Sequence, residues 1–402
     1  MVQSAVVGSR SRIVCLGAAV VLLAVAGSTV AVGSPAVPEA QSLQEAWVRG
    51  ADTVWVFTQD EYGPAAGGGA QGIKLSTDGG VRWSDVTPPG LSVQGAKHWI
   101  NGLFALNADD AWVWYGGLGA EAPQSVIATT DGGRKWRVLG PKPPSCALDF
   151  VSVSHGWCAA IGAAAGSESV TLYRTIDGAR SWQVVSRTSP HSFSPAALPF
   201  GGDKNIEFTT ANVGWAAFGT AAGVAPLYET ENGGRRWIRR TVAVPPRDVG
   251  PPPQAGYGAM FAGQPTINGR FGAVGYTVDQ RVGTRTIVYR TTDAGSDWSP
   301  VVPPGPGKPW LVDTLTARSW RLVYGNRILV TDDAGRTWHT ITTNHTFPAL
   351  FYSFGSPTPP VVVFPSDNIG WIVQQDPEAS TNTLWRTTDG GHQWHQVDIP
   401  GT

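Results

Sequence analysis

The chain has 402 residues, of which 42% are hydrophobic, so it is long enough to bury one large core or two ordinary ones. Charged residues make up only 15% and the formal net charge is −1, which argues against the broad positive field of a nucleic-acid-binding protein. The abundance of glycine (50), proline (31) and tryptophan (18) indicates short strands joined by turns rather than helices.

The N-terminus has the pattern of an export signal. Arg10 and Arg12 precede an uncharged stretch at 13–32, which is followed by small residues and a proline. This pattern is typical of a Sec-type signal peptide, and the stretch is also long enough to remain as a membrane anchor. We therefore interpret residues 1–36 as a signal peptide or anchor and expect residues 37–402 to form one secreted or extracytoplasmic domain, with no other membrane contact.

Two cysteines remain in the exported part of the chain. Cys146 begins an apolar segment, and Cys158 lies in the next one, twelve residues later. Across a hairpin in an oxidising compartment, two such residues can face each other. We predict a disulfide; the alternative is two buried thiols.

A short motif, which reads STDGGVRW at 76–83, occurs in seven variants along the chain. Each copy begins with serine or threonine, has an acidic or amide residue two positions later, and has tryptophan seven positions later. The acidic or amide residues are Asp78, Asp131, Asp177, Asn232, Asp293, Asp333 and Asp389, and the tryptophans are Trp83, Trp136, Trp182, Trp237, Trp298, Trp338 and Trp394.

Sevenfold repetition favours a structural turn over a catalytic group. A short carboxylate or amide accepts hydrogen bonds from backbone N–H groups inside a tight turn, and small residues after it tolerate positive φ. We expect the tryptophan to enter the next strand and bury its ring between neighbouring units. Ala179 replaces glycine in one copy, so strain is expected there if its φ is positive.

A second signature, a small residue followed by tryptophan, precedes most copies. It reads DDAWVW at 109–114, SHGWCA at 154–159, NVGWAAF at 212–218 and NIGWIV at 368–373, with RSWRLV at 318–323 as a variant. The segment 271–277 lacks the tryptophan. With a preceding apolar strand and a strand on each side of the turn, each unit has four strands. Seven such units predict an all-β, seven-bladed β-propeller of four-stranded antiparallel blades.

The repeated motif resembles the Asp-box or BNR repeat of sialidases, other glycoside hydrolases, sortilin-type receptors and the photosystem II stability/assembly factor family. The chain looks most like the assembly-factor-like group. That resemblance implies a non-catalytic, monomeric propeller that binds a protein or a glycan of the cell envelope and needs neither a cofactor nor a metal. The repeat turns also lack the alternating acidic ligands of a calcium loop.

The longest predicted loops lie on the propeller face opposite the repeat turns, where binding is expected. One of them, at 344–360, contains the densest aromatic group outside the strands: His345, Phe347, Phe351 and Tyr352. This group is either a platform for a sugar or peptide, or a cover that buries its own rings.

Two inner-strand carboxylates suggest the alternative function. Asp149 and Glu207 lie eight residues before Trp157 and Trp215, so they occupy equivalent positions in adjacent blades. Such a pair can serve as acid and nucleophile on a glycoside, or can simply line a wet channel. The first use predicts a sialidase-like or other glycoside hydrolase acting at the channel mouth, although the arginine-containing signature of sialidases is absent from the sequence.

Overall fold

The structure, a computed structural model, describes residues 12–14, 41–60, 70–91, 98–117, 122–162, 168–192, 194–200, 204–218, 226–243, 260–262, 266–280, 283–304, 311–316, 318–347, 361–375 and 382–402. Every regular element within these ranges is a β-strand. The prediction of an all-β chain is therefore confirmed.

Strands that follow one another in the chain pair into antiparallel sheets. The first sheet contains β1 (Arg12–Val14), β2 (Gln41–Arg49), β3 (Thr53–Asp60), β4 (Gln71–Ser76) and β5 (Ser84–Asp85). The second contains β6 (Trp99–Ala105), β7 (Asp110–Gly116), β8 (Gln124–Thr130) and β9 (Arg137–Pro141), and the third contains β10 (Leu148–Phe150), β11 (Gly156–Ile161), β12 (Val170–Thr175) and β13 (Gln183–Thr188).

A nine-stranded sheet follows, in which two antiparallel units meet. One unit contains β14 (Lys204–Phe208), β15 (Gly214–Phe218), β16 (Leu227–Thr230) and β17 (Ile238–Val242). The other contains β18 (Met260–Ala262), β19 (Thr266–Asn268), β20 (Phe271–Gln280), β21 (Gly283–Thr291) and β22 (Asp297–Val301). They join through a short parallel pairing between β17 and β22.

The two last sheets are again four-stranded. One contains β23 (Leu311–Thr314), β24 (Trp320–Tyr324), β25 (Arg327–Thr331) and β26 (His339–Thr342), and the other contains β27 (Val361–Val363), β28 (Gly370–Gln375), β29 (Asn382–Thr387) and β30 (His395–Gln396). Each antiparallel unit is called a blade below and is named by its strands.

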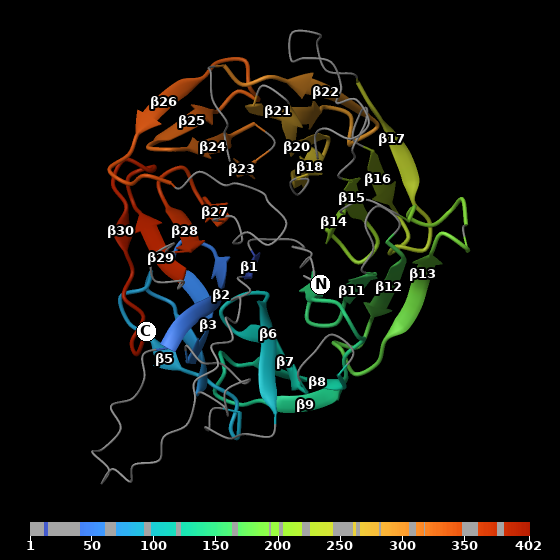
Figure 1. Ribbon diagram of the computed structural model, residues 1–402, viewed down its shortest axis with the longest axis vertical. Coiled ribbons are helices and arrows are strands. Elements are labelled where there is room, and N and C mark those ends of the chain that lie inside the picture. The colour runs from blue at the N-terminus through green and yellow to red at the C-terminus, as the bar shows by residue number, and fades with distance from the viewer. Residues whose placement is uncertain are drawn as a thin grey trace, which may run out of the picture.

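The blades stand around a common centre, as in a β-propeller (Figure 1). The first strand of a blade, such as β6, β14 or β23, lies near the centre, and the last, such as β9, β17 or β26, lies at the rim. Among the described strands, the β27–β30 blade and the β2–β5 blade exchange none. Arg386 instead forms an ion pair of 2.9 Å with Asp52, and the backbone N–H of Gln41 donates to the carbonyl of Gly401 at 2.7 Å.

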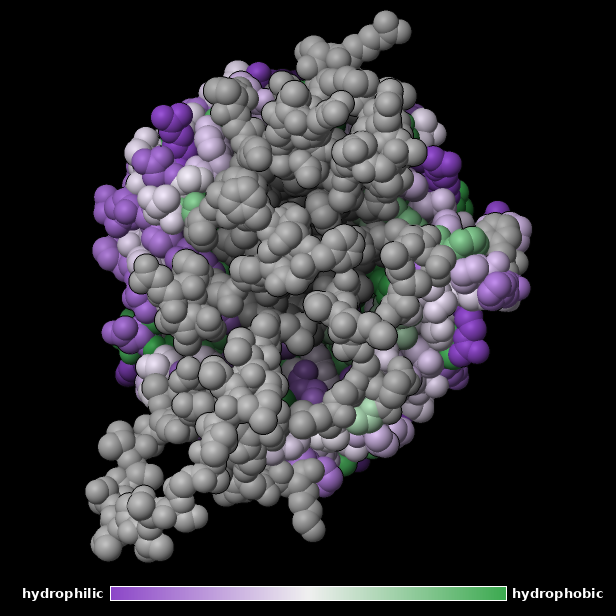
Figure 2. Space-filling view, in the orientation of Figure 1, coloured by the Kyte–Doolittle hydropathy of each residue, from purple (hydrophilic) through white to green (hydrophobic). Residues whose placement is uncertain are grey.

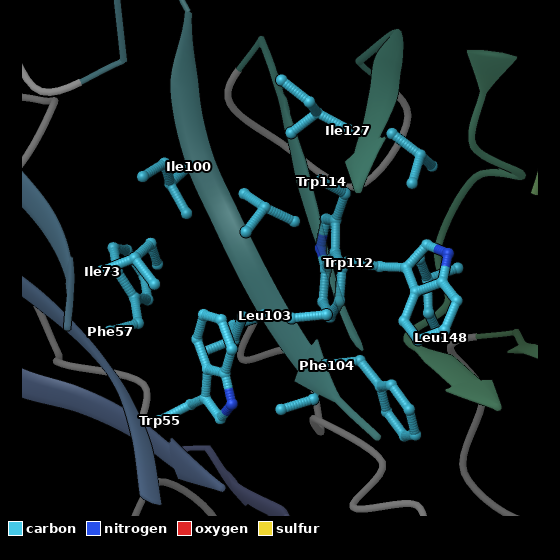
Figure 3. Packing of buried hydrophobic residues seen from close by; sticks show 14 of the residues in the cluster. Trp55, Phe57, Ile73, Ile100, Leu103, Phe104, Trp112, Trp114, Ile127 and Leu148 are labelled. Atoms are coloured by element: carbon cyan, nitrogen blue, oxygen red, sulfur yellow. The ribbon is translucent and has the colours of Figure 1, made fainter. Parts of the chain in front are cut away.

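The core lies between the blades rather than within one of them. Trp112 of β7 stacks on Phe150 of β10 with ring centroids 3.9 Å apart, and its neighbours form one continuous apolar cluster across three blades (Figure 3). In the space-filling view, hydrophilic residues gather along the rim (Figure 2). Burying a ring of this size contributes about 2 to 3 kcal/mol, so each contact between blades helps to close the ring.

The predicted turns have the expected chemistry. In all seven copies the serine or threonine hydroxyl donates to the acidic or amide residue at 2.7 to 3.1 Å. The same oxygen of that residue accepts the backbone N–H four positions later at 2.8 to 3.1 Å. Hydrogen bonds from Arg82 lower the pKa of Asp78 to about 2. These carboxylates therefore hold turns and stay ionised at neutral pH.

Ala179 has a φ of 76°, in the left-handed region, so the condition under which strain was expected in this turn is met. Ala294 and Ala334 share this conformation, with φ of 62°. The predicted disulfide between Cys146 and Cys158 is also present, with a Cα to Cα distance of 5.5 Å. It ties the start of the inner strand β10 to β11.

At the N-terminus, β1 pairs antiparallel with β2, with Ile13 opposite Ala46. The remainder of the predicted signal segment 1–36 lies outside the described residues. Among the residues that the structure describes, no helix is long and apolar enough to cross a membrane.

Candidate active site at the inner strands

Three inner strands carry an acidic residue at one register position. Asp149 of β10 pairs with Trp157, and Glu207 of β14 pairs with Trp215. The third is Asp313 of β23, which pairs with Arg321. Side chains directly opposite each other share one face of a sheet. Each carboxylate therefore lies on the face of its blade that carries the buried partner side chain.

That face contacts the following blade. Trp157 stacks on Phe208 of β14, and its indole N–H donates to the carbonyl of Gly233 at 3.1 Å. Asp149 consequently lies on the side of β10 that faces β14, and β10 contacts both β6 and β14. By the same rule Glu207, opposite Trp215, lies on the side of β14 that faces the β18–β22 blade, where Trp215 packs against Trp298. The residues predicted as a pair thus come from neighbouring inner strands but lie at successive blade interfaces. Glu207 is 6% exposed, and both carboxylate oxygens of Asp149 are buried.

Sequence reasoning missed Asp313 because the tryptophan signature is shifted by one residue in β24. Trp320 occupies the position that is glycine in β11 and β15, and Arg321 occupies the position of the buried tryptophan. Counting back eight residues from Trp320 leads to Val312, whereas counting from Arg321 leads to Asp313. A basic residue directly after the tryptophan was the available signal for this shift.

Steric contact explains why β11 and β15 have glycine at this position. A Cβ on Gly156 would come within 2.6 Å of the ring of Phe150, and one on Gly214 within 2.5 Å of Phe208. The residue that pairs with Trp320 is Thr314 rather than phenylalanine. A tryptophan is therefore found at this position only where the inner strand has no phenylalanine opposite it.

Asp313 differs electrostatically from an ordinary carboxylate. Its Oδ2 accepts the backbone N–H of Phe364 at 2.6 Å, which links β23 to the end of β27. Burial raises the pKa of Asp313 to about 7, although that hydrogen bond and the nearby Arg321 act in the opposite direction. A carboxyl group with such a pKa holds its proton at mildly acidic pH and can donate it there.

Arg321 is 3% exposed, and two aspartates other than Asp313 neutralise its charge. Its guanidinium contacts Asp332 at 3.2 Å and Asp367 at 2.9 Å, and it lies 5.9 Å from the ring centroid of Phe364. The arginine thus replaces the indole as the group that packs on the next blade. Its charge partners hold it at the blade interface.

The predicted aromatic group is only partly described. His345 contacts Gln374 through its Nε2 at 2.8 Å, and its ring lies 4.2 Å from Trp385. Phe347 is 2% exposed and packs edge-on against Trp394. Phe351 and Tyr352 lie outside the described residues. The two described rings pack into the β27–β30 blade, and desolvation lowers the pKa of His345.

No group of three or more histidine, cysteine, aspartate or glutamate side chains with metal-binding geometry occurs among the described residues. The carboxylates of Asp149, Glu207 and Asp313 come from three separate inner strands.

Comparison with known proteins supports the fold. No protein-family model matches the chain, and no curated protein matches it. Among solved structures, an ulvan lyase of polysaccharide lyase family PL25, bound to -[GlcA(1-4)Rha3S]-, is similar with a TM-score of 0.50 and 9% identity, covering 90% of this chain and 97% of that one.

The β-propeller domain of the Trilobed protease from Pyrococcus furiosus has the same TM-score of 0.50 at 8% identity, covering 90% of this chain and 99% of that one. The GH93 α-L-arabinofuranosidase of Fusarium graminearum with arabinobiose has a TM-score of 0.39 at 11% identity, covering 71% of this chain and 90% of that one. At such identities the similarity to the ulvan lyase and to the protease domain shows the fold alone, a β-propeller.

One expectation from the sequence is wrong. The chain was expected to be a non-catalytic binding propeller of the assembly-factor-like kind. The structures that resemble it over nine-tenths of its length instead include a polysaccharide lyase with a glycan bound. The alternative, an enzyme that acts on carbohydrates, agrees better with this finding.

Proposed function

We propose that the protein cleaves glycosidic bonds in a polysaccharide, using carboxyl groups of its inner strands. The observation that carries the proposal is the placement of Asp149, Glu207 and Asp313 at one register position of β10, β14 and β23. The glycan bound by the lyase of similar fold suggests the ligand class.

The chemistry needs two carboxyl groups in different protonation states. One donates a proton to the leaving oxygen, and the other acts as a base or nucleophile at the sugar. We assign these roles to Asp149 and Glu207, which belong to adjacent inner strands. Asp313, whose pKa is raised to about 7, is the third candidate and is suited to proton donation.

The repeat architecture belongs to the same proposal. We infer that the seven turns are Asp-box repeats and that β14–β17 and β18–β22 are separate blades, which gives seven blades in all. The shared hydroxyl and carboxylate hydrogen bonds of the turns support this inference. The disulfide supports an exported protein, since such bonds persist in oxidising compartments.

The test is a screen of the purified chain against neutral and anionic polysaccharides, with release of new sugar ends as the readout. We expect turnover of at least one substrate and a loss of roughly 100-fold or more in Asp149→Asn and Glu207→Gln. Asp85→Asn, on the exposed outer strand β5, is the matched control and should retain activity. Equal activity in all three variants would refute the assignment.

A further inference from the structure

The strand β20 of the β18–β22 blade carries no tryptophan at the position where β11 and β28 carry one. Ala273 of β20 pairs with Arg290 of β21, just as Trp157 pairs with Arg174 and Trp371 pairs with Arg386. Ala273 is fully buried, in one apolar cluster with Trp320 of the next blade. The position that carries an indole in β11 and β28 thus carries a methyl group in β20.

This change alters the surroundings of the paired arginine. The guanidinium groups of Arg174 and Arg386 lie over the indoles of their partners, with 5.5 and 5.1 Å to the ring centroids. Arg290 has no such ring at the paired position. Its Nη1 donates to the carbonyl of Ala334 in the next blade at 3.0 Å, and its side chain lines a cavity of about 200 Å³.

A second arginine at this cavity also departs from its counterparts. Arg134, Arg180 and Arg235 each donate to the carbonyl of the acidic or amide residue in their own turn. Arg336 has the same place in its turn but makes no such bond among the described contacts, and it lines the cavity instead. Two arginines whose contacts differ from those of their counterparts thus line one cavity.

The charge of the cavity is positive. Its lining includes Arg290, Arg318 and Arg336, and one carboxylate, Asp333. Asp333 is committed to its own turn, where it accepts hydrogen bonds from Thr331, from Thr337 and from two backbone N–H groups. Three arginines therefore line the cavity together with one carboxylate that is already bonded, so the formal charge of the lining residues is positive and attracts an anion.

An aromatic ring completes the lining. Phe271 is 42% exposed, unusually high for a phenylalanine. Arg270 lies over it, 5.7 Å from the ring centroid, and donates to the carbonyl of Thr292 at 2.8 Å. The cavity thus presents an apolar face for the body of a ligand beside donors for its charged group.

We propose that this cavity binds an oxyanion, namely the sulfate, phosphate or carboxylate group of a small ligand. Planar guanidinium groups bind such oxygens through paired hydrogen bonds, and a space of this size admits the anionic group with part of its carrier. The site lies on the face of the repeat turns, between Thr292 and Arg318. It is separate from the inner-strand carboxylates and does not depend on their activity.

The experiment is equilibrium titration of the purified chain with sulfate, phosphate and D-glucuronate at constant ionic strength, with D-glucose as the uncharged control. We expect saturable binding of at least one anion and none of glucose. Arg290→Gln and Arg336→Gln should each weaken binding about tenfold, whereas Arg134→Gln, at the same place in another turn, should leave binding unchanged.

The three probes separate the sources of the oxyanion. Preference for D-glucuronate indicates a carboxylate-bearing sugar, and preference for sulfate or phosphate indicates an ester of that acid. Arg336 is exposed, so its variant is expected to fold even if Arg290→Gln does not. Absence of saturable binding by all three anions, or equal affinity in Arg336→Gln, would overturn the proposal. Neither result bears on polysaccharide cleavage, which is measured separately.

Discussion

The indole of Trp157 stacks on the ring of Phe208 in the next blade, with centroids 3.7 Å apart and planes inclined by 3°. Trp112 and Phe150 repeat this relationship one blade earlier, at 3.9 Å and 7°. Contacts of this kind join blades that share no strand hydrogen bonds, so they determine how firmly the ring is closed.

Removing one of these rings should therefore cost much stability. We expect Trp157→Ala to lower the free energy of unfolding by about 3 to 5 kcal/mol, because the indole is 2% exposed and its loss leaves a cavity. Chemical denaturation monitored by circular dichroism measures this change. Val81→Ala is the control, since Val81 is 76% exposed, and it should change stability by less than about 0.5 kcal/mol.

The repeat turns depend on one oxygen atom of the acidic residue. In the turn at 129–136, Oδ1 of Asp131 accepts the Thr129 hydroxyl and the backbone N–H of Lys135, both at 2.9 Å. We expect Asp131→Ala to lower the midpoint of denaturant unfolding, and Asp131→Asn to lower it clearly less, since an amide oxygen can accept the same bonds. Asn232 already does so in another turn. Equal losses in both variants of Asp131 would contradict this role.

The raised pKa of Asp313 gives stability a specific pH dependence. The folded chain keeps a proton on this carboxyl up to about pH 7, whereas the unfolded chain releases it near its ordinary value of 3.8. Between these values the folded state binds more protons, so this residue lowers stability as pH rises.

Asp313→Asn removes that titration and keeps an acceptor for the N–H of Phe364. We expect the variant to gain stability relative to the unaltered chain as pH rises from about 4 to 7, measured by denaturant unfolding at several pH values. A constant difference, or a gain on acidification, would show that Asp313 is not held protonated by burial.

The disulfide closes a short loop. Cys146 and Cys158 are separated by 12 residues, for which loop-closure entropy predicts a contribution of about 3 kcal/mol. We expect Cys146→Ser with Cys158→Ala to lower the unfolding free energy by up to that amount. Adding a reductant should then destabilise the unaltered chain but not the double variant.

The sequence predicted the parts of the fold that depend on local chemistry. Serine or threonine, an acidic or amide residue and small residues together specify a turn, and each of the seven turns has the predicted hydrogen bonds. The spacing of Cys146 and Cys158 likewise specified a pair across one hairpin. Such features need only a few neighbouring residues, so a single sequence contains them in full.

The remainder depends on contacts between blades that no short segment contains. Trp320 seemed to continue the tryptophan signature, but it occupies the glycine position because Thr314 replaces a phenylalanine in the inner strand. That single shift hid Asp313. The cavity beside Arg290 is lined by residues of two blades, so it becomes visible only when the two blades are placed together.

The most direct test of the proposed activity is the release of new sugar ends from a polysaccharide. It is measured for the unaltered chain and for the double variant Asp149→Asn, Glu207→Gln, at a temperature at which both are folded. We expect measurable turnover by the unaltered chain and a loss of at least about 100-fold in the variant. Turnover that persists in the variant, or none by the unaltered chain on any neutral or anionic polysaccharide, would contradict a catalytic role for the inner-strand carboxylates.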